Sequence, residues 1–272
     1  MHNTLKNTVE KYIQNNSSLT VAVSGGVDSV TLSVFLSNKI NCYRLNVAHA
    51  ISSAVPREAT KRVKSLAKKY NWNLHILNAG ELQDPKYISN PINRCYYCKT
   101  NLYSSISKTI PGQIFSGANL DDLKDFRPGL EAAKNSSVIH PFIEAKMDKK
   151  AVRKLAMKLG LSTISGLPSS PCLSSRIQTG INITSDLLKK IDEVEIKIRN
   201  IIPNSDVRCR WLKKGVVIEF NEPNIDKLEN IYKSQIISFT GKTFELSKEF
   251  ISIKKYKKGS AFIGKKEGVT NG

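Results

Sequence analysis

The chain of 272 residues lacks any apolar run of the roughly 20 residues that a membrane-spanning helix needs. Its first six residues, MHNTLK, also lack the apolar core of a secretory signal. We therefore expect a cytoplasmic protein with no membrane partner. The length is sufficient for a sizeable core and favours two domains over one.

Cysteine and acidic residues are both scarce. In a reducing compartment, the five cysteines are read as metal-binding or catalytic before they are read as disulfides. Only 23 Asp and Glu oppose 42 Lys and Arg, and the formal charge of +19 is large enough to attract polyanions such as tRNA. The basic residues are mostly scattered lysines without an aromatic-interleaved stripe, so a solvated basic surface is an equal alternative.

Two common phosphate-binding motifs are missing, the Walker A loop and the Gly-x-Gly-x-x-Gly fingerprint. In their place, SGGVDS follows the apolar run 19–23 and precedes apolar residues at helical spacing over 27–36. Glycines let the backbone approach an anion, and the amides at a helix start attract negative charge. The pattern predicts a phosphate loop made of Ser24, Gly25, Gly26, Val27, Asp28 and Ser29; the alternative is a glycine-rich turn that binds nothing.

Strands and helices alternate over the first part of the chain, which predicts an α/β fold with a parallel sheet and ligands at the carboxyl ends of its strands. A cluster of Pro and Ser over 167–177 marks a domain boundary or an active-site loop. We expect one domain over 1–167 and a smaller α+β domain over 168–272. The expected strands are 19–23, 42–48, 73–77, 113–117, 206–211 and 216–220, and the expected helices include 4–14, 27–36, 102–107, 149–159, 185–202 and 225–232.

Polar residues follow the strand predicted at 113–117. Paired acids such as Asp121 and Asp122 could hold Mg²⁺ or could cap a helix. Because a phosphate loop is expected at the same sheet edge, we favour a nucleotide or metal role for some of these residues, with Asn119, Asp122 and Arg127 as candidates.

Cys95 and Cys98 have the C-x2-C spacing that lets two thiolates bind one metal or cluster. A complete zinc site would need two more ligands, and a redox pair or two small buried side chains are the alternatives. Cys172 lies far along the chain, where Arg176 could lower its pKa. Cys42 and Cys209 are expected to be structural, and His49 either lines an adenine pocket or packs in the core.

SGGVDS resembles the pyrophosphate loop of the N-type ATP pyrophosphatases, which cleave ATP between its α and β phosphates. The full set of motifs resembles the LarE-type sulfur transferases, which serve biosynthesis of a nickel-pincer nucleotide cofactor. The resemblance covers about 20–180 and is looser from 205 to 260, where Arg208, Arg210, Glu219 and the segment from Lys257 to Ser260 are similar in placement only. Besides SGGVDS, the motifs are VPRE at 55–58, NRCYYCK at 93–99, GAN at 117–119 with Asp121 and Asp122, FRPGL at 126–130 and CLSSRI at 172–177.

The resemblance implies a homo-oligomeric enzyme that uses ATP and Mg²⁺ to adenylate a carboxylate of a pyridinium mononucleotide. Pyrophosphate is released, and sulfur then converts the activated carboxylate to a thiocarboxylate. The catalytic residues so implied are Asp28, Cys172, Arg208 and Glu219, and the nucleotide-binding residues are those of the loop 24–29 with Asn119, Asp122 and Arg127.

Two sulfur sources are implied. Cys172 alone would surrender its own sulfur and become dehydroalanine. With Cys95 and Cys98 it would instead hold a [4Fe–4S] cluster whose fourth iron carries a sulfide, and this is the source we favour. The rivals to the whole interpretation are a tRNA thiolase with such a cluster, an amidating ligase similar to NAD synthetase, and a module that only senses nucleotides. The supplier of sulfide stays open.

Overall fold

The computed structural model describes residues 2–15, 18–40, 44–124, 126–169, 171–203, 205–221, 228 and 230–257. The chain divides into two compact units. Unit 1 comprises Met1–Asp84 and Asn93–Ser170, and unit 2 comprises Pro85–Ile92 and Pro171–Gly272. No helix in the described ranges combines the length and the apolar character that crossing a membrane requires.

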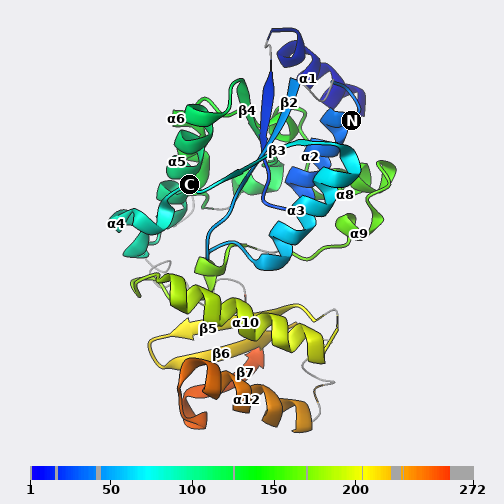
Figure 1. The fold of residues 1–272 in the computed structure, drawn as a ribbon. Helices are drawn as coiled ribbons and strands as arrows, with labels where there is room; N and C mark the ends of the chain where they lie inside the picture. The colour runs from blue at the N-terminus through cyan, green and yellow to red at the C-terminus, as the bar shows by residue number, and fades with distance from the viewer. Residues whose placement is uncertain are drawn as a thin grey trace. The chain divides into compact units, whose positions relative to one another are not determined.

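Unit 1 is built on a parallel four-stranded sheet in the order β3-β2-β1-β4 (Figure 1). Val21 of β1 lies between Val47 of β2 and Phe115 of β4, and all three side chains are fully buried. Parallel strands buried on both faces need helices on both sides, which is the α/β fold that the alternating pattern predicts. The strands are β1 (Leu19–Ala22), β2 (Leu45–Ala50), β3 (Asn73–Leu77) and β4 (Gln113–Ser116).

Helices α2, α3 and α8 lie to one side of this sheet, and α5 and α6 lie to the other (Figure 1). The central helix α2 is so deeply buried that its Thr31 and Ser33 hydroxyls donate to carbonyls four residues earlier, at 2.6 and 3.0 Å. The helices of unit 1 are α1 (His2–Asn15), α2 (Val27–Ser37), α3 (Arg57–Tyr70), α5 (Arg94–Thr109), α6 (Pro128–Asn135), α7 (Pro141–Glu144), α8 (Lys149–Lys158) and α9 (Ser162–Ser165), with 3-10 turns η2 (Glu81–Gln83) and η3 (Leu120–Lys124).

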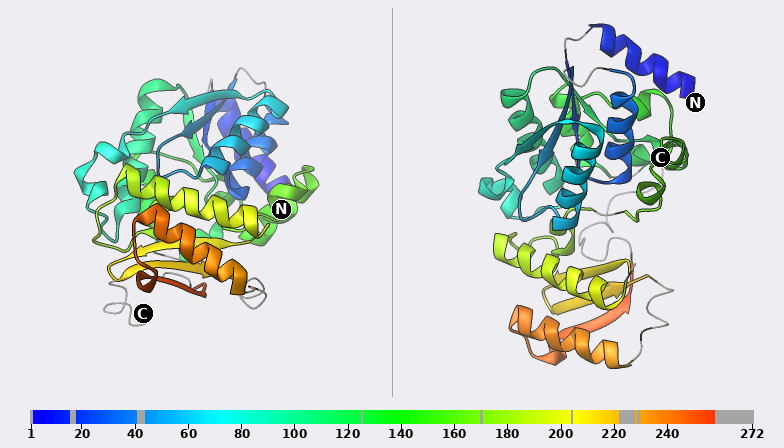
Figure 2. Two further views of the ribbon diagram at one scale, coloured as in Figure 1. Left: turned by 60° about the horizontal axis from the view of Figure 1, so that its bottom comes forward. Right: turned by 45° about the vertical axis from the view of Figure 1, so that its right-hand side comes forward.

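Unit 2 has a three-stranded sheet in the order β5-β6-β7, in which β5 and β6 are antiparallel and β7 is parallel to β6. Two long helices, α10 and α12, lie side by side over this sheet (Figure 2). The strands are β5 (Val207–Leu212), β6 (Gly215–Phe220) and β7 (Ile251–Lys255), and the helices are α4 (Pro85–Ile88), α10 (Ser185–Ile201) and α12 (Asn230–Phe244), with 3-10 turns η4 (Leu173–Arg176) and η5 (Lys248–Phe250).

Several boundaries differ from the sequence prediction. Helix α5 begins at Arg94, so Cys95 and Cys98 are helical rather than part of a loop that precedes a helix at 102–107. The second strand begins at Leu45, and 41–43, including Cys42, lie outside the described residues. Strand β7 was not predicted. Of the helix expected at 225–232, residues 225–227 and 229 lie outside the described residues, and 230–232 form the start of α12, which continues to Phe244.

Candidate functional site

The loop 24–29 connects β1 to α2 and is closed by its own serines. The Ser29 hydroxyl accepts the Ser24 amide at 3.2 Å and donates to the Gly26 carbonyl at 3.3 Å. Ser29 is buried, whereas Ser24 is exposed and its hydroxyl lies 3.3 Å from that of Ser29. The buried Ser29 hydroxyl therefore holds the loop together from inside, and the loop presents the Ser24 hydroxyl at the surface.

Backbone packing fixes the loop from two sides. Gly25 has φ of +83°, and a Cβ there would lie 2.9 Å from the Ala59 carbonyl oxygen of α3. Gly117, just past β4, packs so closely that its Cβ would lie 2.7 Å from the Ser29 amide nitrogen. Arg62 of α3 adds a hydrogen bond of 2.8 Å to the Gly25 carbonyl. The loop is thus shaped by its neighbours before any ligand binds.

Asp28 lies in the first turn of α2 and is the acid of the loop. Its Oδ2 receives a hydrogen bond of 2.5 Å from the Lys149 ammonium of α8, while its buried Oδ1 has no partner among the described residues. Burial raises the pKa of the Asp28 carboxyl, and Lys149 opposes that effect. A buried carboxylate oxygen without a partner, beside a phosphate loop, fits a Mg²⁺ ligand.

The acids after β4 are engaged locally. Asp122 accepts the Asn119 amide at 3.0 Å and pairs with Arg127 at 2.9 Å. Asp121 accepts the Lys149 amide at 2.9 Å. These contacts support the capping interpretation for both acids, and the nucleotide role of Asn119, Asp122 and Arg127 stays a prediction.

His49, near the end of β2, is bonded through both ring nitrogens. Nδ1 lies 2.8 Å from the Val23 carbonyl, and Nε2 lies 2.9 Å from the Thr60 hydroxyl. Burial lowers the pKa of His49, so the ring is neutral and carries its proton on Nδ1, because the carbonyl can only accept. These contacts favour the packing interpretation over an adenine contact.

Cys95 and Cys98 are three residues apart near the start of α5, so both lie on one face of that helix. Both are half-buried. Helix α6 approaches them closely, since a Cβ on Gly129 would lie 3.6 Å from the Cys95 carbonyl oxygen. Two thiolates on one helical face suit a shared cluster, and the third cysteine, Cys172, belongs to unit 2. Within the described ranges, no group of three or more His, Cys, Asp or Glu side chains is arranged to hold a metal ion.

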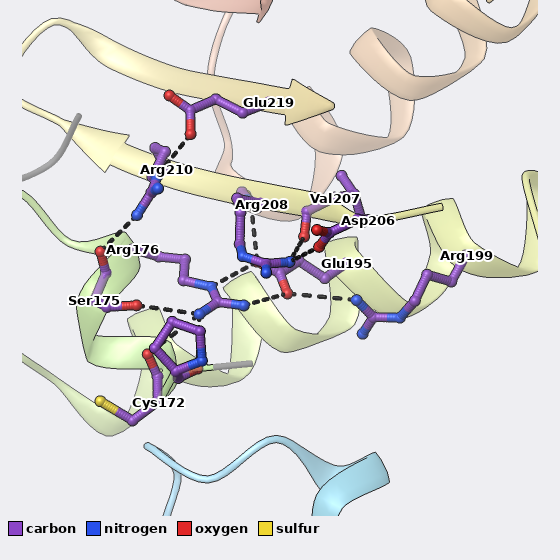
Figure 3. A network of polar contacts seen from close by, with 12 residues as sticks. Cys172, Ser175, Arg176, Glu195, Arg199, Asp206, Val207, Arg208, Arg210 and Glu219 are labelled. Atoms are coloured by element: carbon purple, nitrogen blue, oxygen red, sulfur yellow. Dashed lines mark hydrogen bonds and ion pairs between the residues drawn. The ribbon is translucent and has the colours of Figure 1, made fainter. Parts of the chain in front are cut away.

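Cys172 immediately precedes η4, and a buried arginine holds its loop. Arg176 is 1% exposed and donates to the carbonyl oxygens of Pro171 and Cys172 at 2.7 and 3.3 Å. Its Nε and Nη2 make a bidentate ion pair with the Glu195 carboxylate of α10, at 2.9 and 3.1 Å. Figure 3 shows the Cys172 sulfur directed away from Arg176. The described contacts of Arg176 therefore position the main chain of the cysteine loop.

Glu195 is the acid at the centre of this cluster. Burial acts to raise the pKa of Glu195, but Arg176 and the Cys209 amide, which donates at 2.9 Å, hold it below its ordinary value. Arg199 also approaches Glu195, at 3.5 Å. Cys209 is fully buried in β5, as its structural interpretation requires.

The polar face of β5 and β6 carries the other predicted residues of unit 2. Arg210 pairs with Glu219 at 2.9 Å and donates to the Ser175 carbonyl at 2.8 Å, which connects the strand to the cysteine loop (Figure 3). Arg208 pairs with Asp206 and donates to the Val207 carbonyl at 2.9 Å. Cys172, Arg208 and Glu219 thus belong to one polar cluster of unit 2. Of the segment from Lys257 to Ser260, which the resemblance also singled out, 258–260 lie outside the described residues.

Three side chains that shape these sites were not predicted from the sequence, namely Arg62, Lys149 and Glu195. For Glu195 a signal existed, because it occupies the apolar stripe of α10 formed by Leu188, Ile191 and Ile198. An acid in a buried stripe requires a cationic partner. Arg62 and Lys149 lie on basic helices, where nothing distinguishes them from solvated neighbours.

A family model described as PP-loop domain matches residues 1–89. An uncharacterized protein of Synechocystis sp. (strain ATCC 27184 / PCC 6803 / Kazusa) is 31% identical over 194 residues, which are 70% of this chain and 71% of that protein. An uncharacterized protein of Methanocaldococcus jannaschii is 29% identical over 259 residues, 93% of this chain and 96% of that one.

A third relative is the pyridinium-3,5-bisthiocarboxylic acid mononucleotide synthase of Lactiplantibacillus plantarum. It is 27% identical over 227 residues, which cover 82% of this chain and 81% of the synthase. The matched domain contains the closed loop 24–29, and the similarity to the synthase extends over most of both chains. The chain belongs to the LarE-type PP-loop proteins.

Proposed function

We propose that this protein is an ATP-dependent sulfur transferase that converts a carboxylate of a pyridinium mononucleotide into a thiocarboxylate. The observation that carries the proposal is the preformed loop 24–29, in which Asp28 has a buried oxygen without a partner among the described residues. The similarity to a synthase of a bisthiocarboxylic acid mononucleotide supports the choice of acceptor.

The first step would occur at the loop of unit 1. A carboxylate oxygen of the acceptor attacks the α-phosphorus of ATP, the bond to the β-phosphate oxygen breaks, and pyrophosphate leaves. The loop amides and Ser24 would stabilise the departing diphosphate, and Asp28 would hold Mg²⁺ through Oδ1. The product is an acyl adenylate, whose carbonyl carbon is a far better electrophile than that of a carboxylate.

The second step would use the cysteine loop of unit 2. Sulfur forms a bond to the acyl carbon and AMP leaves with the electron pair of the broken bond. In the Cys172 cluster, Arg176, Arg199, Arg208 and Arg210 face Glu195, Asp206 and Glu219, so the arginines exceed the acids by one. We propose that Arg208 and Glu219 orient the nucleotide acceptor at this cluster.

The donated sulfur has two possible origins in this chain. A [4Fe–4S] cluster held by Cys95, Cys98 and Cys172 would supply renewable sulfide from the iron that no cysteine binds. Without it, the Cys172 thiolate attacks the adenylate, and elimination across its Cα–Cβ bond leaves the sulfur on the product and dehydroalanine in the protein. We favour the cluster because all three thiols occur in motifs of the family.

The test is to incubate anaerobically reconstituted protein with ATP and either the pyridinium biscarboxylate mononucleotide or unmodified tRNA. We expect pyrophosphate release and a thiocarboxylate product with the mononucleotide, detected by mass spectrometry. Sulfur incorporated only into tRNA would replace this proposal with a tRNA thiolase, which the formal charge of +19 would suit.

The sulfur source is tested separately by iron and acid-labile sulfide analysis of anaerobic protein and of Cys95→Ala. We expect both elements in the parent protein and their loss in the variant. Protein without iron that loses one hydrogen sulfide from its mass per turnover would show instead that Cys172 is consumed.

A further inference from the structure

Helix α8 borders a depression of about 500 Å³ with a strongly cationic lining. Among the described residues that line it, Lys149, Lys150, Arg153 and Lys154 contribute four positive charges and Asp121 contributes one negative charge. Such an excess of positive charge in a concave site favours a small polyanion. The proposed function, which uses the loop 24–29 in unit 1, gives this pocket no role.

The pocket adjoins the phosphate loop through Lys149. The ammonium of this residue lies 2.5 Å from Asp28, its side chain is 32% exposed, and it also lines the pocket. Arg153, one helical turn further along the same face, exerts its charge on Asp28 as well. One lysine, Lys149, thus belongs both to the phosphate loop's surroundings and to the wall of the pocket.

The wall of the pocket is partly rigid. Arg153 donates to the carbonyl oxygens of Ser165 and Leu167, the latter at 2.7 Å, so its guanidinium ties α8 to the last residue of α9 and the segment that follows. Lys150 and Lys154 are exposed and one turn apart. At 1.5 Å rise per residue, 149–154 spans about 7.5 Å, a length that suits two or three linked phosphates.

We propose that this pocket, lined by Lys149, Lys150, Arg153 and Lys154, is the subsite that receives pyrophosphate after its cleavage from ATP and from which pyrophosphate is released. This rests on the proposed function, in which ATP is cleaved between its α and β phosphates. No covalent step occurs in the pocket: the diphosphate arrives with its charge already formed. The cations lie within one short helix, whereas RNA recognition uses a longer basic track.

The test measures binding of inorganic pyrophosphate with Mg²⁺ to the full-length protein by calorimetry. The double variant Lys150→Ala, Lys154→Ala removes two exposed charges, and we expect pyrophosphate to bind about tenfold more weakly while AMP affinity stays unchanged. The matched control is Lys158→Ala, an exposed lysine of α8 that does not line the pocket, and it should bind pyrophosphate as the parent does. Unchanged melting temperatures would verify that both variants are folded.

Equal pyrophosphate affinity in the double variant and the parent would overturn the subsite. If the parent still releases pyrophosphate from ATP in that case, the proposed function stands without it. Weaker tRNA binding in the double variant with unchanged pyrophosphate affinity would reassign the pocket to RNA. A parent protein that binds neither ATP nor pyrophosphate would overturn both the subsite and the proposed function.

Discussion

Arg176 shows how one buried side chain can hold the shape of a whole loop, here the loop that carries Cys172. A buried guanidinium is costly unless each of its donors is used, and here they contact one carboxylate, two carbonyl oxygens and the Ser175 hydroxyl. Lysine could not reproduce this planar arrangement of donors. The main chain around Cys172 is therefore positioned by an arginine whose ion pair with Glu195 the sulfur itself does not join.

We predict that Arg176→Ala destabilises the protein by about 3–5 kcal/mol, because it leaves Glu195 charged, buried and without its main partner. Arg199→Ala is the matched control. It removes the second, longer contact to the same acid at 3.5 Å and should cost about 1 kcal/mol or less. Urea unfolding measures both free energies, and equal losses would show that Arg176 does not anchor the cluster.

The lowered pKa of Glu195 makes the free energy of unfolding depend on pH. Its folded-state pKa lies below its ordinary value of 4.5, so the unfolded chain binds more protons between the two values and stability falls as pH falls through that window. We expect Glu195→Gln to reduce this acid-dependent loss, although the variant is less stable at neutral pH. Urea unfolding at a series of acidic pH values gives the slope; identical slopes in parent and variant would contradict the assignment.

At the scale of elements, the phosphate loop is held in shape by the backbone packed against it. Gly117→Ala should weaken nucleotide binding and destabilise unit 1 by about 1–3 kcal/mol, because its Cβ would overlap the Ser29 amide at the start of α2. Gly166→Ala is the matched control, since its nearest Cβ neighbour lies at 3.9 Å and its φ is −83°. Urea unfolding and ATP titration compare the two variants. Equal effects would mean that the backbone at Ser29 shifts at little cost to accommodate the added Cβ.

The alternation of strands and helices could be predicted because buried parallel strands and amphipathic helices leave distinct apolar periods. The start of α5 was not predicted because Cys and Tyr, which occupy 95–98, are weak helix formers, although Asn93 is a residue type favoured before a helix. Strand β7, with the sequence ISIKK, needs the partner strand β6 to exist. The acid at Glu195 stands out in the apolar stripe of α10, but its partner Arg176 lies 19 residues away, and Lys149 lies 121 residues from Asp28. No local pattern identifies partners at such separations in the sequence.

At the scale of the whole molecule, the proposal assigns ATP cleavage to unit 1 and sulfur transfer to unit 2. A variant of either unit should therefore affect the two steps differently. In Cys172→Ala the loop 24–29 is untouched, so we expect pyrophosphate release from ATP to continue while no thiocarboxylate forms. In Asp28→Asn we expect both to be lost, because the Mg²⁺ ligand proposed for the first step is gone. Asp28→Asn should nevertheless fold, since burial raises the pKa of Asp28 and ionisation of that carboxyl therefore opposes folding above its ordinary pKa of 3.8.

A coupled pyrophosphate assay and mass spectrometry of the nucleotide product measure the two steps in the same reaction. The expected pattern requires Cys172→Ala to accumulate acyl adenylate or its hydrolysis products, AMP and the original carboxylate. Thermal melting of Asp28→Asn at neutral pH should give a temperature no lower than that of the parent protein. If Cys172→Ala still transfers sulfur, the donor is elsewhere; if Asp28→Asn still releases pyrophosphate, the loop acid does not hold the metal.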